Sequence, residues 1–159
     1  MSGADNALHV GEPMPRIASV QPAGELSVSV TWGAGIRAGR TDVVDLAPVI
    51  MTLRFYAPLR EDLSLFASVT VIEDGTALSW DGGRIDMAAT TVERLGRETM
   101  SSEDFRTFLL RNKLTLDAAA ASLGISRRQV AYYARGKPVP RLVALACAGY
   151  EATRGVLAA

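Results

Sequence analysis

The hydrophobic and polar positions of this chain follow two different periods. From about residue 14 to residue 96, apolar and polar residues mostly alternate, which indicates half-buried β-strands. After residue 100, apolar residues recur every three or four positions, as on one face of an amphipathic helix. The chain is therefore expected to be an α+β protein, with a small antiparallel sheet followed by an all-α part.

The clearest strand signal is the stretch ELSVSVTW at residues 25–32. One face of this strand carries Leu26, Val28, Val30 and Trp32, and the other carries Ser27, Ser29 and Thr31. Other strands are expected at 16–22, 41–46 and on both sides of a hairpin turn at Asp74-Gly75. Short helices are expected at 47–50 and 59–66, the second with Leu59, Leu63 and Phe66 on one face, and a further helix at 89–97.

Four helices are expected in the rest of the chain, at 101–113, 115–123, 127–135 and 141–155. Ser101 and Ser126 are suited to cap the first and third of these helices. Gly124 can end the second helix in a left-handed conformation, and Gly136 follows the third.

The third helix has an inward and an outward face. With Val130 buried, a rotation of about 100° per residue places Arg128, Tyr132 and Arg135 on the opposite side. Arginine can grip guanine or phosphate, glutamine can pair with adenine, and tyrosine can reach a phosphate. The predicted DNA-binding residues are Arg127, Arg128, Gln129, Tyr132, Arg135 and Lys137, with Arg141 as a further backbone contact.

The distribution of charge supports this interpretation. The net charge is zero, but residues 1–99 hold 8 Lys/Arg against 13 Asp/Glu, and residues 100–159 hold 9 against 4. A basic C-terminal part is typical of a module that binds a polyanion, although small helical modules often carry some extra positive charge.

The sequence offers little for catalysis. A single histidine, His9, and a single cysteine, Cys147 in an apolar run, exclude the usual zinc sites and nucleophilic triads. Asp42 with Asp45, and Asp81 with Asp86, lie at strand ends and turns, where aspartate serves its own backbone. We expect no enzyme activity, no metal and no cofactor, and we expect Trp32 and Trp80 to anchor a core or an interface.

No apolar run approaches the ~20 residues of a membrane span, and no secretion signal is visible. Together with the single cysteine, this favours a cytoplasmic protein without a membrane partner. Residues 1–13, which include His9, are expected to form a mobile tail.

The stretch LTLDAAAASLGISRRQVAYYARGKPVP, at residues 114–140, resembles the Cro and lambda-repressor (Xre-like) type of helix-turn-helix. The resemblance covers roughly residues 101–155 and implies that residues 126–135 form a recognition helix, with Arg127 and Arg128 at base-reading positions. Leu116 stands where that group commonly has a phosphate-binding glutamine, and Asp117 lies beside it. This departure leaves open a helix-turn-helix that binds protein and has lost its affinity for DNA.

The segment 14–90 is similar to the bacterial domain-of-unknown-function family 2442. Its marks are the strand ending VTWG, the VDLAP motif and the late WDGGRID. The resemblance implies a small α+β domain that is sometimes fused to a helix-turn-helix or encoded beside toxin-like genes. We therefore expect an N-terminal domain at 14–96 and a DNA-binding domain at 101–159, joined within residues 88–101.

Three functions follow, in order of preference. The first is a transcriptional regulator that binds double-stranded DNA as a homodimer, because this class usually needs two half-sites. The second is an antitoxin-like protein whose acidic N-terminal domain holds a toxin-like partner. The third is a sensor of a small ligand, which no feature of the sequence names.

Overall fold

The alternating pattern near the N-terminus folds into a three-stranded antiparallel sheet with the order β1-β2-β3. The computed structural model describes residues 11 and 13–158, so that His9 and most of the expected tail lie outside the described residues. The strands are β1 (Arg16–Pro22), β2 (Ser27–Ala34) and β3 (Thr41–Asp45). Val28, Val30 and Trp32 of β2 are buried, as the pattern predicts.

A second antiparallel sheet of three strands follows, with the order β4-β5-β6. Its strands are β4 (Thr70–Val71), β5 (Ala77–Trp80) and β6 (Ile85–Ala88). The turn between β4 and β5 lies against β1, where the Ile17 amide donates to the Gly75 carbonyl at 2.8 Å. Gly75 has φ +75°, and a Cβ there would lie 2.6 Å from the Ile17 carbonyl oxygen, so this close approach requires glycine.

Short helices and one longer helix complete the N-terminal part. They are α1 (Ala47–Ile50), the 3-10 turn η1 (Arg54–Tyr56), α2 (Ala57–Glu61), α3 (Leu63–Ala67), the 3-10 turn η2 (Asp81–Gly83) and α4 (Ala89–Arg97). Trp32 and Trp80 are both buried in the shared core. Trp80 Nε1 donates to the Phe66 carbonyl at 2.9 Å, so the core satisfies its polar atom.

The expected helix at 59–66 is wrong in one respect. Asp62 adopts an extended conformation and accepts from the Ser64 and Leu65 amides, so it ends α2 and caps α3. The helix is therefore broken in two, and the stripe is interrupted. Leu59 and Phe66 are buried, but Leu63 is 48% exposed.

The C-terminal part is helical and has its own buried cluster. It consists of α5 (Ser102–Arg111), α6 (Leu116–Leu123), α7 (Arg127–Ala134) and α8 (Arg141–Ala158). Ser101 and Ser126 each form a capping box, and Gly124 ends α6 with φ +72°. These findings confirm the expected fold class, an antiparallel sheet followed by helices.

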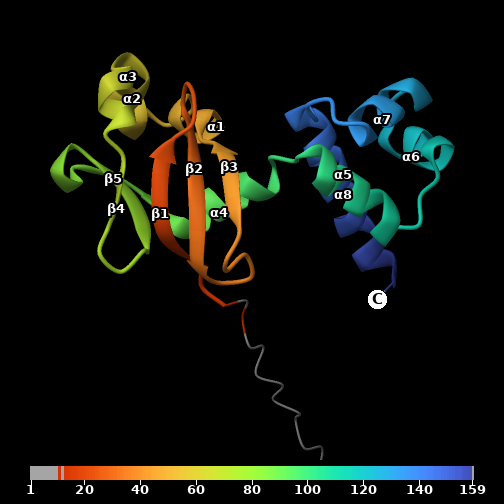
Figure 1. The fold of residues 1–159 in the computed structure, drawn as a ribbon, viewed down its shortest axis with the longest axis horizontal. Helices are drawn as coiled ribbons and strands as arrows, with labels where there is room; N and C mark the ends of the chain where they lie inside the picture. Colours follow the sequence, from red (N-terminus) through yellow and green to blue (C-terminus); the bar gives the residue numbers. More distant parts are fainter. Residues whose placement is uncertain (1–10, 12, 159) are drawn as a thin grey trace, which may run out of the picture.

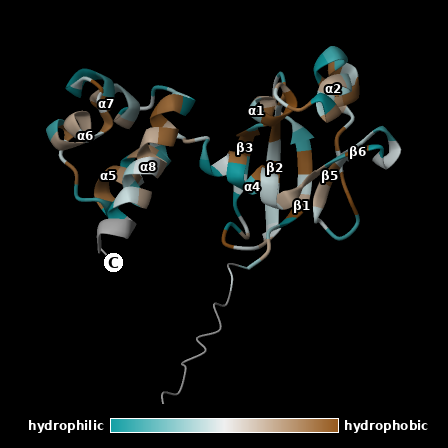
Figure 2. Cartoon of the chain, turned by 180° about the vertical axis from the view of Figure 1, so that it is seen from behind, coloured by the Kyte–Doolittle hydropathy of each residue, from teal (hydrophilic) through white to brown (hydrophobic). Residues whose placement is uncertain are grey.

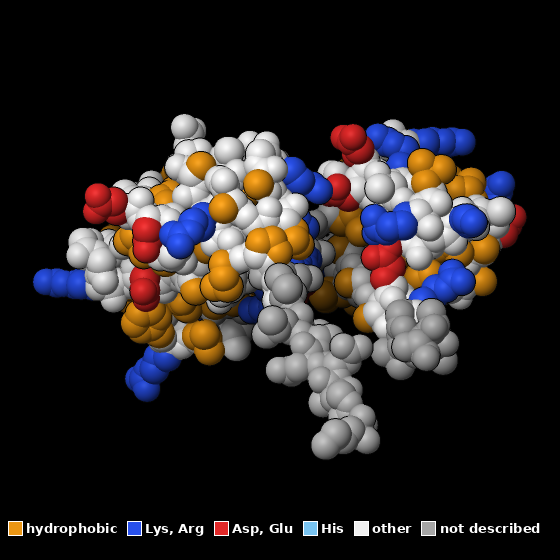
Figure 3. Space-filling view, turned by 90° about the horizontal axis from the view of Figure 1, so that it is seen from below, with side chains coloured by type: hydrophobic (Ala, Val, Ile, Leu, Met, Phe, Trp, Pro, Cys, Tyr) orange, Lys and Arg blue, Asp and Glu red, His pale blue; other side chains and the backbone are white. Residues whose placement is uncertain are grey.

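The two buried clusters are separate, and α4 leads from one to the other. The first cluster ends at Leu95 and the second begins at Phe105. The space-filling view shows two lobes with a recessed waist between them (Figure 3). Among the described residues, Arg40 pairs with Asp104 of the other lobe, and Arg141 pairs with Glu98 of the connecting segment. α6 and α7 lie at the far end of the molecule, with α5 and α8 between them and the sheet (Figure 1).

Candidate nucleic-acid interface

The candidate interface is built on α6, α7 and the short turn between them. Gly124 and Ile125 both donate to the Ala120 carbonyl, at 3.0 and 3.1 Å, which closes α6. Val130 of α7 and Ala119 of α6 are fully buried in the second cluster. The small side chain of Ala119 allows the two helices to approach closely. The pattern that placed Val130 inward is therefore correct, and α7 presents its opposite face to solvent.

The polar side chains predicted for DNA binding lie on this side of α7. Arg127, Arg128 and Gln129 are exposed, and Tyr132 is half-buried. Arg135 and Lys137, at the end of the helix and just beyond it, are also exposed. Figure 2 shows hydrophilic residues at the start of α7, on the side away from the sheet.

Three of these residues form a group, which we call the Tyr132 cluster: Arg128, Tyr132 and Lys137. Arg128 Nε donates to the Tyr132 hydroxyl at 2.5 Å, and its guanidinium lies 5.2 Å from the centre of the ring. Lys137 Nζ lies 4.5 Å from the same centre. The Tyr132 ring therefore contacts two cations, each by cation–π attraction. Such a cluster can bind one or two phosphate oxygens.

Arg127 has a different environment. Its Nε lies 3.1 Å from Asp117 Oδ1, so the guanidinium is paired with a carboxylate at the start of α6. Both side chains are largely exposed, which leaves the pair in water and easily exchanged. The acid that departs from the Xre-like pattern is thus in direct contact with a predicted base-reading residue.

Gln129 is partly committed to the helix itself. Its Oε1 accepts from the Ser126 amide at 3.0 Å, while the Ser126 hydroxyl accepts from the Gln129 amide. This is a capping box, in which the glutamine satisfies a backbone donor. Its side-chain NH₂ group is left for another acceptor, and its oxygen, which it shares with the cap, has one further lone pair for a contact to adenine.

Two contacts that the sequence analysis missed fix the exit of α7 on α5. Arg106 donates to the Ala134 carbonyl at 2.8 Å, and the Ser102 hydroxyl donates to the Lys137 carbonyl at 2.9 Å. Arg106 is exposed and Ser102 is half-buried on an amphipathic helix, and nothing in the sequence pattern gives either a partner about 30 residues away. They hold Lys137 in place beside Tyr132.

Two further sequence expectations look different in the structure. Arg141 is paired with Glu98 on the connecting segment, so it is not free to contact DNA as predicted. Leu116 packs partly buried against the second cluster, so the position where a phosphate-binding glutamine was missing serves the core.

The remaining candidate groups have structural roles. Asp42 accepts from Trp32, Arg37 and Arg40, and Asp45 accepts from the Ala47 amide at the start of α1. Cys147 is buried, and burial raises the pKa of its thiol to about 12. Within the described residues, no group of three or more His, Cys, Asp and Glu side chains is arranged to hold a metal ion. None of the described helices is both long and apolar enough to span a membrane.

Comparison with models of protein families and with curated proteins gives no match, so neither the family 2442 resemblance nor the Xre-like resemblance is confirmed. Among solved structures, the chain is similar to Putative DNA Binding Protein NE0471 from Nitrosomonas europaea ATCC 19718. The two are 33% identical, 88% of each chain is covered, and the TM-score is 0.43. At this identity and coverage the chain belongs to the same family as the NE0471 protein. This family relationship rests on the sequence identity and coverage, and not on the structural similarity.

Proposed function

We propose that this protein is a sequence-specific DNA-binding protein, a cytoplasmic transcriptional regulator that places α7 in the major groove. The observation that carries the proposal is the exposed basic face of α7, which follows α6 after a short turn and lies at the end of the molecule opposite the sheet (Figure 1). This order of elements is the one that helix-turn-helix docking uses. The name of the NE0471 protein, a relative in sequence, agrees with such a role.

The residues of the interface divide into two kinds. Arg127 and Arg128 lie in the first turn of α7, where the residues of a recognition helix meet base edges, and guanine is the base that arginine grips best. Tyr132, Arg135 and Lys137 lie toward its end and suit phosphates, which fix the position of the protein on the duplex. Gln129 adds one donor while its oxygen stays in the cap.

A single module of this size makes few contacts, so specific binding requires two copies. We propose a homodimer that reads two half-sites about one helical turn apart, ~34 Å. In this arrangement the domain at 14–96 dimerises or senses a partner, and the protein carries out no catalysis.

The proposal is tested by selecting genomic fragments on the full chain at low salt, beginning with the promoter of its own gene. Fluorescence titration then compares the wild type with the double variant Arg127→Ala/Arg128→Ala. We expect a preferred fragment, and a loss of about 2–4 kcal/mol of specific binding in the variant. Binding without preference, or a variant that binds as the wild type does, would show that α7 does not read DNA.

A second candidate function is an antitoxin-like protein that holds a basic partner and regulates its own gene. The observation that favours it is the charge of residues 1–99, where acids exceed bases by five. Purification from the native host should then yield a stoichiometric basic partner. Recovery of the chain without a partner, together with a neighbouring gene that encodes a small acidic protein, would count against this function.

A further inference from the structure

We infer that the free edge of β3 is a binding site for an extended peptide of a partner protein, which adds to the sheet as a fourth strand. β3 is an edge strand, since β2 is the neighbour that the sheet order gives it. The inference does not rest on DNA binding, because the backbone groups that carry it belong to β3 in the N-terminal part.

The hydrogen-bond pattern shows which backbone groups of β3 are available. The backbone amide of Trp32 donates to the Arg40 carbonyl at 2.9 Å, and the backbone amide of Leu46 donates to the Leu26 carbonyl at 2.9 Å. Hydrogen-bonded pairs in an antiparallel ladder occur at every second residue. The backbone N–H and C=O groups of Asp42 and Val44 therefore also point toward β2. The N–H and C=O groups of Thr41, Val43 and Asp45 therefore point away from the sheet. Within the described residues these groups have no backbone partner across the edge.

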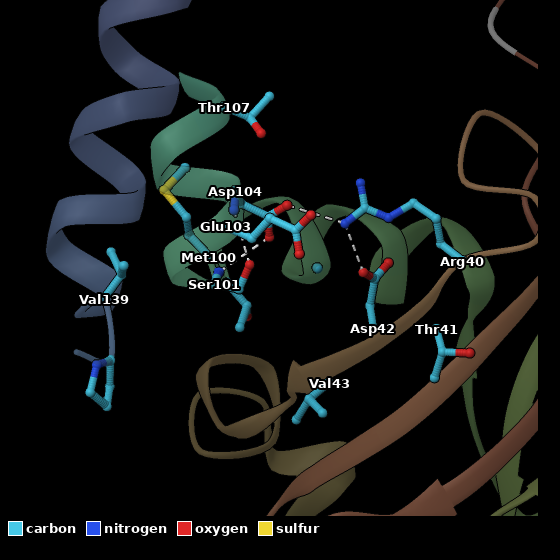
Figure 4. A pocket seen from close by; sticks show the side chains of 13 residues that line it. Arg40, Thr41, Asp42, Val43, Met100, Ser101, Glu103, Asp104, Thr107 and Val139 are labelled. Carbon is cyan, nitrogen blue, oxygen red and sulfur yellow. Dashed lines mark hydrogen bonds and ion pairs between the residues drawn. The ribbon is translucent and has the colours of Figure 1, made fainter. Parts of the chain in front are cut away.

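This edge opens into a groove and not onto a flat surface. A cavity of about 880 Å³ lies between β3 and the start of α5. Figure 4 shows Thr41 and Val43 on one side of it and Ser101, Glu103, Asp104 and Thr107 on the other. Val43 is a large apolar side chain, yet it is 55% exposed here. A strand the length of β3, five residues, spans about 17 Å, and cavities of roughly 300–1,000 Å³ are the usual size of ligand sites.

Glu103 favours a peptide with a cationic side chain, because the other two carboxylates that line the groove are already paired with arginine. The charged side chains among its lining residues are three carboxylates, Asp42, Glu103 and Asp104, and one guanidinium, Arg40. Arg40 bridges the groove by contacting both Asp42 and Asp104, at 3.1 and 3.3 Å. Glu103 is exposed on the wall formed by α5. A lysine or arginine that points toward α5 would find this carboxylate, while alternate residues of the peptide would rest on Val43.

An extended peptide fits this site better than a second copy of the chain does. The start of α5 and residues 138–139 form the far wall of the groove. A single strand needs only about 4.8 Å beside β3, whereas a second sheet approaching edge to edge would meet that wall. Main-chain bonds supply the affinity in this mode of recognition, so one site can accept many sequences of the right alternation.

The experiment pans a phage-displayed library of random peptides of about ten residues against the full-length protein. Val43→Pro is the counter-selection, because it removes an outward N–H and leaves the bonds of Asp42 and Val44 to β2 in place. Val43→Ala is its matched control, since it keeps the N–H. We expect enriched peptides that alternate β-branched and polar residues and carry a Lys or Arg. Binding should fall at least about tenfold in V43P and less than about threefold in V43A.

Two further measurements make the result decisive. Bound peptide should slow amide hydrogen exchange at Thr41, Val43 and Asp45, which point into the groove, more than at Asp42 and Val44. Two versions of the peptide, N-methylated at the odd or at the even positions, should differ. The version that blocks the N–H groups facing β3 should lose binding, and the other should keep it. No enrichment, equal binding by V43P with a native-like circular dichroism spectrum, or protection elsewhere would overturn the proposal. A dimer of the chain that V43P dissociates, with no peptide selected, would also overturn it in favour of a second copy.

Discussion

Asp117 Oδ1 lies 3.1 Å from Arg127 Nε, so a carboxylate at the start of α6 is paired with a guanidinium at the start of α7. Both side chains are exposed, and a pair of this kind contributes only ~0.2–1 kcal/mol. Its position matters more than its strength. A duplex that approaches α7 has to take Arg127 from Asp117, and the remaining carboxylate then faces phosphates.

The first prediction is that Asp117→Asn strengthens DNA binding. Removing the carboxylate frees Arg127 and ends the repulsion of the phosphates, so we expect affinity to rise about two- to fivefold at low salt, with a smaller gain at high salt. Fluorescence titration over a range of salt concentrations measures both. The matched control is Asp81→Asn, which removes an exposed carboxylate paired with Arg84 in the N-terminal part. Equal gains in the two variants would show that only net charge matters.

The second prediction concerns the turn between β4 and β5, which packs against β1 of the other sheet. Gly75→Ala should lower the free energy of unfolding by about 3 kcal/mol or more, because its Cβ meets the Ile17 carbonyl and its φ is left-handed. Gly82→Ala is the control, because it lies in the same part of the chain and has φ +62° but open space around it. We expect it to lose only ~1–2 kcal/mol. Urea unfolding monitored by tryptophan fluorescence compares them, and equal losses would contradict the close approach of β1 to the turn.

The third prediction follows from the pKa of Asp42. Burial acts to raise this pKa, but hydrogen bonds from Arg37 and Trp32, with the charges of Arg37 and Arg40, lower it below its ordinary value of 3.8. A lowered folded-state pKa stabilises the protein above the unfolded pKa, and this stabilisation is lost as the pH falls through the folded value. Asp42→Asn should therefore lower the free energy of unfolding by about 1–2 kcal/mol at neutral pH.

The deficit of Asp42→Asn should shrink as the pH falls below about 4, where the wild type loses the same charge. Urea titrations at several pH values measure it. Asp86→Asn, which removes an exposed carboxylate, is the control. A deficit that stays constant down to about pH 2 would mean that the charge of Asp42 is not what holds this network together.

The fourth prediction concerns Cys147. Because burial raises the pKa of its thiol to about 12, only ~10⁻⁴ of it is thiolate at a pH of about 8. Its reaction with a thiol-specific disulfide reagent should be more than about 100-fold slower in the folded protein than in urea. A fast reaction without denaturant would show that α8 opens readily from the second cluster.

The sequence predicts the elements well because their signals are local. Alternation along residues 25–32 identifies the buried face of β2, and Gly124 and Ser126 mark the end of α6 and the start of α7. Asp62 shows the limit of this reasoning: the helical spacing of Leu59, Leu63 and Phe66 outweighed a residue that caps helices. A cap can divide a stripe that periodicity alone joins.

The interactions of the candidate site were less predictable, because they depend on side chains distant in sequence. The exposed face of α7 followed from helix geometry, but the pairing of Arg127 with Asp117 and of Arg141 with Glu98 did not. The distance between α6 and α7 decides the first, and the path of the connecting segment decides the second. The groove beside β3 was unpredictable for the same reason, since it exists only where two separately packed parts meet.

The central claim is that the protein meets DNA through α7. The most direct measurement is an NMR titration of the full chain with its preferred duplex, following each backbone amide. We predict that the largest shifts lie in residues 115–137, and that Arg127→Ala/Arg128→Ala weakens them without changing the spectrum of the free protein elsewhere. Shifts concentrated in β1, β2 or β3, or a variant that gives the wild-type response, would contradict the claim.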